Sequence, residues 1–223
     1  MRETESEARA EAREVSIPAG RISLEGHLDI PRGPRGVVLF AHGTGSSRHS
    51  RRNQFVAQRL QESGLATLLM DLLTVDEEEE DARTARLRFD MGLLARRLVA
   101  AMDWLGQDPR IHHLPVGLFG ASSGAGAALV AAAERPQAVK AVVSRGGRPD
   151  LAGEALSRVQ APTLLIVGSR DTAVIEMNRQ AFEQLRCVKD LVIVPGASHL
   201  FEEPGALEEV ATLAAAWFTR HLR

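Results

Sequence analysis

The sequence predicts an α/β fold in which a mostly parallel central sheet is covered by helices on both faces. Three observations lead to this prediction. Short, continuous apolar runs recur along the chain, as in strands that are buried on both faces. Amphipathic patterns of helical length separate most of these runs, which is the alternation of βαβ units. Small and polar residues follow several runs directly, at the strand ends where such sheets bind ligands.

The predicted strands begin with an antiparallel hairpin. Alternating apolar residues at 15–17 and 22–30 flank a turn at Gly20, a pattern typical of two paired strands. Val37–Phe40 then begins the series of buried runs. The remaining predicted strands are Ala66–Met70, Val116–Phe119, Val139–Val143, Thr163–Val167 and Leu191–Val194.

Helical patterns lie between these runs. They cover Ser50–Ser63, Ala85–Leu105, Ser123–Ala133, Thr172–Leu185 and Leu207–Leu222. Because there is no internal repeat and no long Pro/Gly/Ser linker, residues 15–223 are predicted to form one domain. Residues 1–14 are predicted to be a charged leader, flexible or helical. Only about twenty residues separate Val143 from Thr163, so no substantial lid is expected between these strands.

Composition excludes several classes of function. The net charge is −2 with 25% charged residues, so we expect no basic surface for nucleic acid. No apolar run has the length of a membrane span, and the N-terminus lacks the apolar core of a signal peptide. The single cysteine, Cys187, excludes an internal disulfide and a cysteine-based metal cluster. We therefore expect a cytoplasmic protein without a metal or another cofactor.

The strongest motif is Gly-Ala-Ser-Ser-Gly at residues 120–124. It follows the run Val116–Phe119 and begins an alanine-rich helix, which is the strand–turn–helix context that G-x-S-x-G requires. Flanking glycines permit such a tight turn, and a helix N-terminus favours a developing negative charge. Ser122 is therefore the predicted nucleophile.

A serine hydroxyl needs a base to accept its proton. His199 follows the run Leu191–Val194, and Asp171 follows the run Thr163–Val167, so all three polar residues lie just past strand ends. We predict that His199 is the base and that Asp171 orients it. Taken alone, His199 could be a surface histidine and Asp171 a helix N-cap.

Attack by Ser122 on a carbonyl creates an oxyanion, which needs hydrogen-bond donors in place. The backbone N–H of Ser123, the residue after the nucleophile, is predicted to be one donor. The other is predicted to be the backbone N–H of Thr44, in the glycine-rich loop that follows Val37–Phe40.

Two charged stretches offer further candidates. Arg145 and Arg148 follow the run that ends at Val143 and could bind a substrate carboxylate or phosphate, with a local ion pair as the alternative. The acidic run at residues 76–81 lacks the histidine or turn glycine of a metal site. We interpret it as the solvated start of a helix.

These motifs resemble the dienelactone hydrolase branch of the α/β-hydrolase superfamily. The resemblance covers about Gly20 to Leu222 and rests on His42-Gly43-Thr44-Gly45, the Ser122 turn, the turn at Gly168 and Asp171, and Ser198-His199. It implies the α/β-hydrolase fold. The enzyme that gives the branch its name has a cysteine nucleophile, whereas this chain has Ser122. Some relatives of this kind are similar to domains fused to phosphoribosyltransferases.

The sequence thus predicts a serine hydrolase that cleaves a small-molecule ester, thioester or lactone. The reaction is expected to use a Ser-His-Asp triad and an acyl-enzyme intermediate. Two alternatives remain open at this point. The same triad could transfer the acyl group to another acceptor, as an acyltransferase or perhydrolase. The fold could also serve a non-catalytic binding protein. No nucleic-acid or membrane partner is expected.

Overall fold

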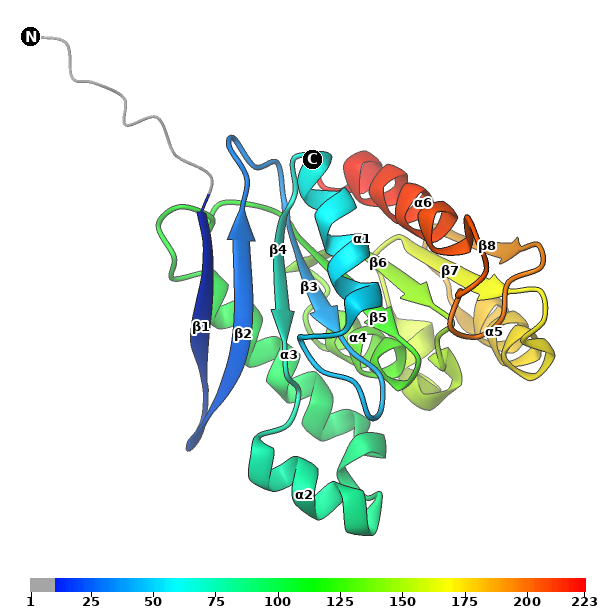
Figure 1. The fold of residues 1–223 in the computed structure, drawn as a ribbon, viewed down its shortest axis with the longest axis horizontal. Coiled ribbons are helices and arrows are strands. Elements are labelled where there is room, and N and C mark those ends of the chain that lie inside the picture. Colours follow the sequence, from blue (N-terminus) through cyan, green and yellow to red (C-terminus); the bar gives the residue numbers. More distant parts are fainter. Residues whose placement is uncertain (1–10) are drawn as a thin grey trace, which may run out of the picture.

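The computed structural model describes residues 11–223, and an eight-stranded sheet forms its centre (Figure 1). The strand order is β1-β2-β4-β3-β5-β6-β7-β8. Strands β1 and β2 are antiparallel to each other, β2 is antiparallel to β4, and all further pairs are parallel. The strands are β1 (Glu11–Ala19), β2 (Ile22–Ile30), β3 (Val37–Ala41), β4 (Ala66–Met70), β5 (Val116–Ala121), β6 (Val139–Arg145), β7 (Thr163–Gly168) and β8 (Lys189–Val194).

Helices connect the parallel strands and cover both faces of the sheet, so the predicted fold class is confirmed. The α-helices are α1 (Arg51–Glu62), α2 (Val75–Thr84), α3 (Met91–Leu105), α4 (Ser123–Glu134), α5 (Thr172–Gln184) and α6 (Ala206–His221). The 3₁₀ helices are η1 (Leu87–Phe89) and η2 (Pro149–Arg158), of which η2 lies in the connection where no lid was expected. Within residues 11–223, no helix is long and apolar enough to cross a membrane.

Two apolar layers hold the helices against the sheet. Neighbouring residues of a strand point to opposite faces, so Leu39 packs in the layer under α3, α4 and α5, and Phe40 in the layer under α1 and α6. This arrangement explains why the central strands are continuously apolar in sequence. The Phe40 and Phe119 rings lie 4.8 Å apart between centroids. Burial of each such side chain contributes about 1.5–3 kcal/mol.

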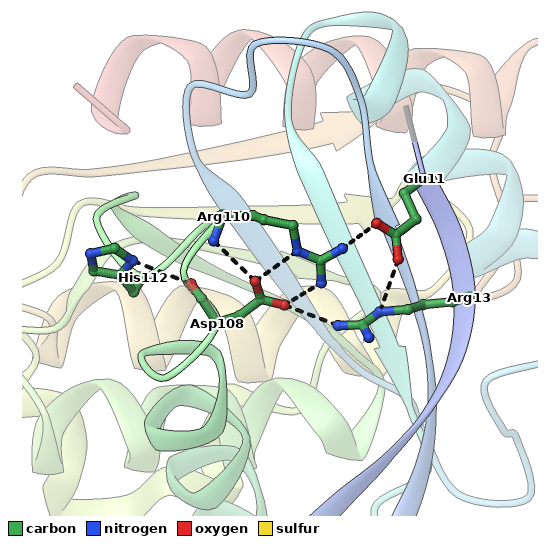
Figure 2. Close-up of polar contacts among 5 residues, drawn as sticks. All are labelled: Glu11, Arg13, Asp108, Arg110 and His112. Atoms are coloured by element: carbon green, nitrogen blue, oxygen red, sulfur yellow. Dashed lines mark hydrogen bonds and ion pairs between the residues drawn. The ribbon is translucent and has the colours of Figure 1, made fainter. Parts of the chain in front are cut away.

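Strand β1 begins at Glu11, which corrects the predicted leader over residues 1–14: residues 11–14 are paired with β2, and residues 1–10 lie outside the described residues. Apolar alternation could not reveal these residues, because their side chains are exposed. Figure 2 shows what holds them: buried Asp108 accepts from Arg13 at 3.0 Å and from Arg110, which also pairs with Glu11. The hydrogen bond from Arg110 holds the pKa of Asp108 below its ordinary value.

The acidic run at residues 76–81 lies in a separate helix, α2, and not at the start of one helix that continues to Leu105. Thr74 and Glu77 form a capping box at its N-terminus, and Ala85 ends it with a left-handed φ of 53°. The chain then turns and starts α3 at Met91. In Figure 1, α2 lies beyond the carboxyl ends of β3 and β4.

Helix α4 and strand β3 approach so closely that only glycine fits at residue 124. A Cβ atom there would lie 2.2 Å from Ala41 O and 2.5 Å from His42 O. We therefore expect Gly124→Ala to lower the free energy of unfolding by about 2 kcal/mol or more, as measured by urea denaturation. The matched control is Gly92→Ala in α3, where the nearest atom to a new Cβ is the flexible Arg96 Nη1 at 3.3 Å. Equal stability of the two variants would contradict the close approach.

Candidate active site

Ser122 lies in the sharp turn between β5 and α4. Its φ of 50° and ψ of −125° fall outside the backbone regions that residues other than glycine favour. Such a conformation costs about 1–3 kcal/mol and persists only where the surroundings enforce it. Here the Ser122 N–H donates to Arg145 O at 3.3 Å, and the Ser122 carbonyl accepts from Arg148 N at 2.9 Å. The loop after β6 therefore holds the strained turn in place.

Asp171 and His199 are in direct contact. The distance between His199 Nδ1 and Asp171 Oδ2 is 2.6 Å, although the two residues follow different strands. Asp171 precedes α5 but makes no capping hydrogen bond with it, so the carboxylate is directed to the histidine. The Asp171 side chain is 15% exposed and that of His199 is 39% exposed. The imidazole is thus oriented by a nearly buried acid while part of it remains accessible.

Gly146 connects this pair to the Ser122 turn. It directly follows Arg145, which accepts the Ser122 N–H, and a Cβ on it would lie 3.0 Å from His199 O and 3.6 Å from His199 Nδ1. Ser122 and His199 therefore contact the same short loop. Within residues 11–223, no hydrogen bond joins Ser122 to His199. Catalytic hydrogen bonds in ligand-free enzymes are often long and close only with substrate.

The loop after β3 lies against the nucleophile. A Cβ on Gly43 would be 2.8 Å from Ser122 Cβ and 3.5 Å from Ser122 Oγ, so glycine is required at this position. His42 fixes the loop, because its Nε2 accepts from Leu72 N at 3.1 Å and its Nδ1 then donates to the Gly43 carbonyl at 2.9 Å. In the part of the chain that the structure describes, the Gly43 N–H has no hydrogen-bond acceptor.

Thr44, the predicted second oxyanion donor, has a hydrogen bond of its own. Its N–H donates to the hydroxyl of the buried Ser123, at 3.1 Å from Oγ. The Thr44 hydroxyl is also 3.0 Å from Ser123 Oγ. The assignment of Thr44 as an oxyanion donor stays a prediction, and the adjacent N–H of Gly43 is a second candidate for this role. The Ser123 N–H is the first of α4 and has no partner within the helix.

The two arginines after β6 have different surroundings. Arg148 donates to Asp150 through Nε at 2.9 Å and Nη2 at 2.7 Å, which raises the pKa of Arg148. This is the local ion pair that the sequence left open as the alternative. Arg145 is only 7% exposed, and its Nε and Nη1 atoms have no hydrogen-bond partner.

A cavity of about 390 Å³ opens beside the turn. Gly43, Thr44 and Ser123 line the end near the nucleophile, and α2 supplies the far wall. Leu72, Leu73 and Leu94 give it an apolar surface. Its volume lies within the range of small-molecule sites. Among the described residues, no group of three or more His, Cys, Asp or Glu side chains is placed to hold a metal ion.

Comparisons with known proteins agree with this architecture. The family model described as "Dienelactone hydrolase family" matches residues 24–221. The crystal structure of a dienelactone hydrolase from Anabaena variabilis is similar, with 63% identity and a TM-score of 0.94 over 97% of this chain and 100% of that one. Est1E from Butyrivibrio proteoclasticus shares the fold, with 17% identity and a TM-score of 0.78 over 93% of this chain and 98% of that one.

Curated relatives from two strains of Mycobacterium tuberculosis carry the name "Putative phosphoribosyl transferase". Each is 57% identical over 209 residues, which are 94% of this chain and 46% of the relative. The chain therefore spans about half the length of the curated relatives that it matches.

Proposed function

The chain belongs to the dienelactone hydrolase family of hydrolases, and we propose that its reaction is the cleavage of a small ester, thioester or lactone by a serine nucleophile. One observation carries this proposal. The strained Ser122 turn and the His199–Asp171 pair lie against the same short loop at Arg145 and Gly146, at the carboxyl ends of β5, β7 and β8. A structural turn would need neither the strain nor an oriented imidazole.

The proposed first step is the attack of Ser122 Oγ on the substrate carbonyl. Asp171 accepts the Nδ1–H of His199, so Nε2 is the nitrogen that can accept the serine proton. The new Oγ–carbon bond converts the carbonyl oxygen into an oxyanion. His199 then returns the proton to the leaving alcohol, thiol or ring oxygen, and an acyl-enzyme remains.

Water completes the cycle in the second step. His199 accepts a proton from the water molecule as it attacks the acyl-enzyme carbonyl, and then protonates Ser122 as the acid is released. Asp171 stabilises the imidazolium that forms in each step. We assign the oxyanion donors to the backbone N–H groups of Ser123 and Gly43. Both residues lie next to Ser122. Among the described residues, neither N–H group donates a hydrogen bond to the chain, whereas the Thr44 N–H donates to Ser123 Oγ.

The cavity beside the oxyanion loop supplies the substrate pocket in this proposal. Its apolar surface suits a small acyl or leaving group. Glu78 of α2 lines the far wall, and burial raises the pKa of its carboxyl. In this proposal, helix α2 limits the length of the group that fits in the cavity.

Active-site labelling tests the proposal directly. The protein is incubated with a fluorophosphonate probe, digested and analysed by peptide mass spectrometry, while a short p-nitrophenyl ester reports turnover. We expect the label on Ser122 and loss of ester turnover in proportion to labelling. Folded protein that neither takes the label nor cleaves the ester would contradict the proposal and favour a binding role.

The assignment of Gly43 predicts a defined catalytic loss. In Gly43→Ala the new Cβ would lie 2.8 Å from Ser122 Cβ and 3.1 Å from Ala121 O, so the loop must move away from the nucleophile. Loss of one oxyanion donor lowers kcat by about 10²–10³-fold. Steady-state kinetics should show this fall with a smaller change in KM. Gly92→Ala is the control and should keep wild-type kinetics; similar kcat values in the two variants would exclude Gly43 as a donor.

A further inference from the structure

The loops that carry Asp171 and His199 are joined by main-chain hydrogen bonds only up to a point short of both residues. The last of these bonds runs from Arg170 N to Ala197 O, at 2.9 Å. Beyond it, within residues 11–223, two polar side-chain links join the loops. One is the contact of 2.6 Å between His199 Nδ1 and Asp171 Oδ2, and the other passes through Glu203. The position of the imidazole therefore depends on side chains as well as on the sheet.

Glu203 contacts the residues that directly precede the proposed acid and base. Its Oε2 accepts from Ser198 N at 3.0 Å, and its Oε1 lies 3.6 Å from Arg170 Nη1. Ser198 is followed by His199, and Arg170 by Asp171. The Arg170 side chain is 66% exposed, so its ion pair contributes little, and the hydrogen bond to Ser198 N is the stronger contact. One carboxylate thus joins the two loops, one residue away from each member of the proposed pair.

The loop that carries His199 contains a strained residue, which must be held in place. Phe201 has a φ of 56°, a rare backbone conformation for a bulky residue that costs about 1–3 kcal/mol. Its N–H donates to Ser198 O at 3.3 Å, which closes a tight turn around His199. Its ring is buried, and a Cβ on Gly146 would lie 3.3 Å from its Cε2. Because Glu203 binds the N–H of Ser198, it fixes the first residue of this turn, while burial of Phe201 fixes the last.

The Glu203 side chain does not serve as a cap for the helix that follows it. Among the residues that the structure describes, no side chain caps α6, which begins at Ala206 after Gly205. The Glu203 carbonyl accepts from Ala206 N at 3.0 Å, and this main-chain bond does not depend on the side chain. The hydrogen bond from Ser198 N lowers the pKa of the Glu203 carboxyl, which is therefore ionised at neutral pH. The carboxylate is thus directed to the turn that carries His199.

We propose that Glu203 is a positioning residue of the active site, which holds the His199 turn so that Nδ1 stays within hydrogen-bond distance of the Asp171 carboxylate. This inference rests on the proposed function. In this role Glu203 touches neither the substrate nor the reacting atoms, and it acts through Ser198 and Arg170. A displacement of about 1 Å at a catalytic group can lower the rate about 10²-fold. Loss of the contact to Ser198 is therefore expected to lower kcat and to leave KM nearly unchanged.

Two substitutions separate the position of the carboxylate from its charge. Glu203→Gln keeps the length of the side chain, and its amide oxygen can still accept from Ser198 N. Glu203→Asp keeps the charge but is one methylene shorter, so it should lose this hydrogen bond. We expect Glu203→Asp to lower kcat for p-nitrophenyl acetate about 10–10²-fold, and Glu203→Gln to keep most of the activity. The reverse order would show that the charge itself acts on His199, and it would overturn the positioning role.

Glu202 provides the matched controls. It precedes Glu203, but its side chain is 64% exposed and its contact with Arg52 is long, at 3.5 Å. Glu202→Gln and Glu202→Asp should therefore keep the kcat and KM of the wild type. Thermal unfolding shows whether each variant is folded at the assay temperature. A Glu203→Asp variant that loses stability but keeps wild-type kcat would have lost only a structural contact, which would overturn the proposal.

Proton NMR tests the position of His199 without catalysis. A proton on His199 Nδ1 that is held by a carboxylate gives a resonance downfield of the backbone amides, and its loss in Asp171→Asn assigns it. We expect this resonance in the wild type and in Glu203→Gln, and its loss or broadening in Glu203→Asp. An unchanged resonance in Glu203→Asp would overturn the proposal. Absence of ester turnover in the wild type would instead contradict the proposed function, and the resonance alone would then decide whether Glu203 positions His199.

Discussion

Replacement of Ser122 by alanine should abolish ester turnover, with kcat reduced by about 10⁵-fold or more. Without Oγ there is no acyl-enzyme, and His199 has no hydroxyl to deprotonate. The backbone that holds the turn is unchanged, because its hydrogen bonds to Arg145 and Arg148 are made by main-chain atoms of Ser122. We therefore expect wild-type stability together with the catalytic loss.

Circular dichroism and thermal unfolding establish that the variant is folded, and p-nitrophenyl ester hydrolysis under matched conditions measures the loss. Ser157→Ala is a suitable control, since the Ser157 hydroxyl bonds to Glu154 O in η2, on the exposed surface. It should retain full turnover. If folded Ser122→Ala protein still turned over the ester, the serine mechanism would be wrong.

The residues of the candidate site could be located from the sequence because they directly follow strands that are recognisable as continuous apolar runs. The run before Ser122 ends within two residues of its observed end, and those before Asp171 and His199 end within one. In a parallel sheet the carboxyl ends of strands meet at one edge, so residues far apart in sequence were expected together. The contact between His199 and Asp171 follows from this topology.

Features that depend on side-chain competition could not be predicted in this way. The glycine-rich loop after β3 indicated an oxyanion donor, but only the structure shows that the Ser123 hydroxyl takes the Thr44 N–H. Arg145 and Arg148 looked equivalent in sequence, although Asp150 neutralises only one of them. Helix α2 was missed as a separate element, because its charged residues have no apolar period and its end depends on a left-handed Ala85.

The second large effect is expected for Asp171→Asn. The carboxylate holds His199 with the proton on Nδ1, at 2.6 Å, which leaves Nε2 free to act as the base. An asparagine amide can present its NH₂ group to Nδ1 and so stabilise the opposite tautomer, in which Nε2 carries the proton. A change of this kind lowers kcat by about 10⁴-fold and leaves substrate binding largely intact, so KM should change little.

The Asp171→Asn variant distinguishes a carboxylate that orients His199 from one that caps a helix. Asp171 makes no side-chain capping hydrogen bond to α5, so we expect the orienting role. A cap would cost stability of about 1 kcal/mol and leave kcat near wild type, whereas an orienting acid gives the reverse pattern. Asp103→Asn is the matched control, since it breaks only an exposed ion pair with Arg135. Steady-state kinetics and urea denaturation of both variants distinguish the orienting role of Asp171 from a capping role. A stability loss in Asp171→Asn without a large fall in kcat would mean that His199 acts without this carboxylate, and the proposed triad would have to be abandoned.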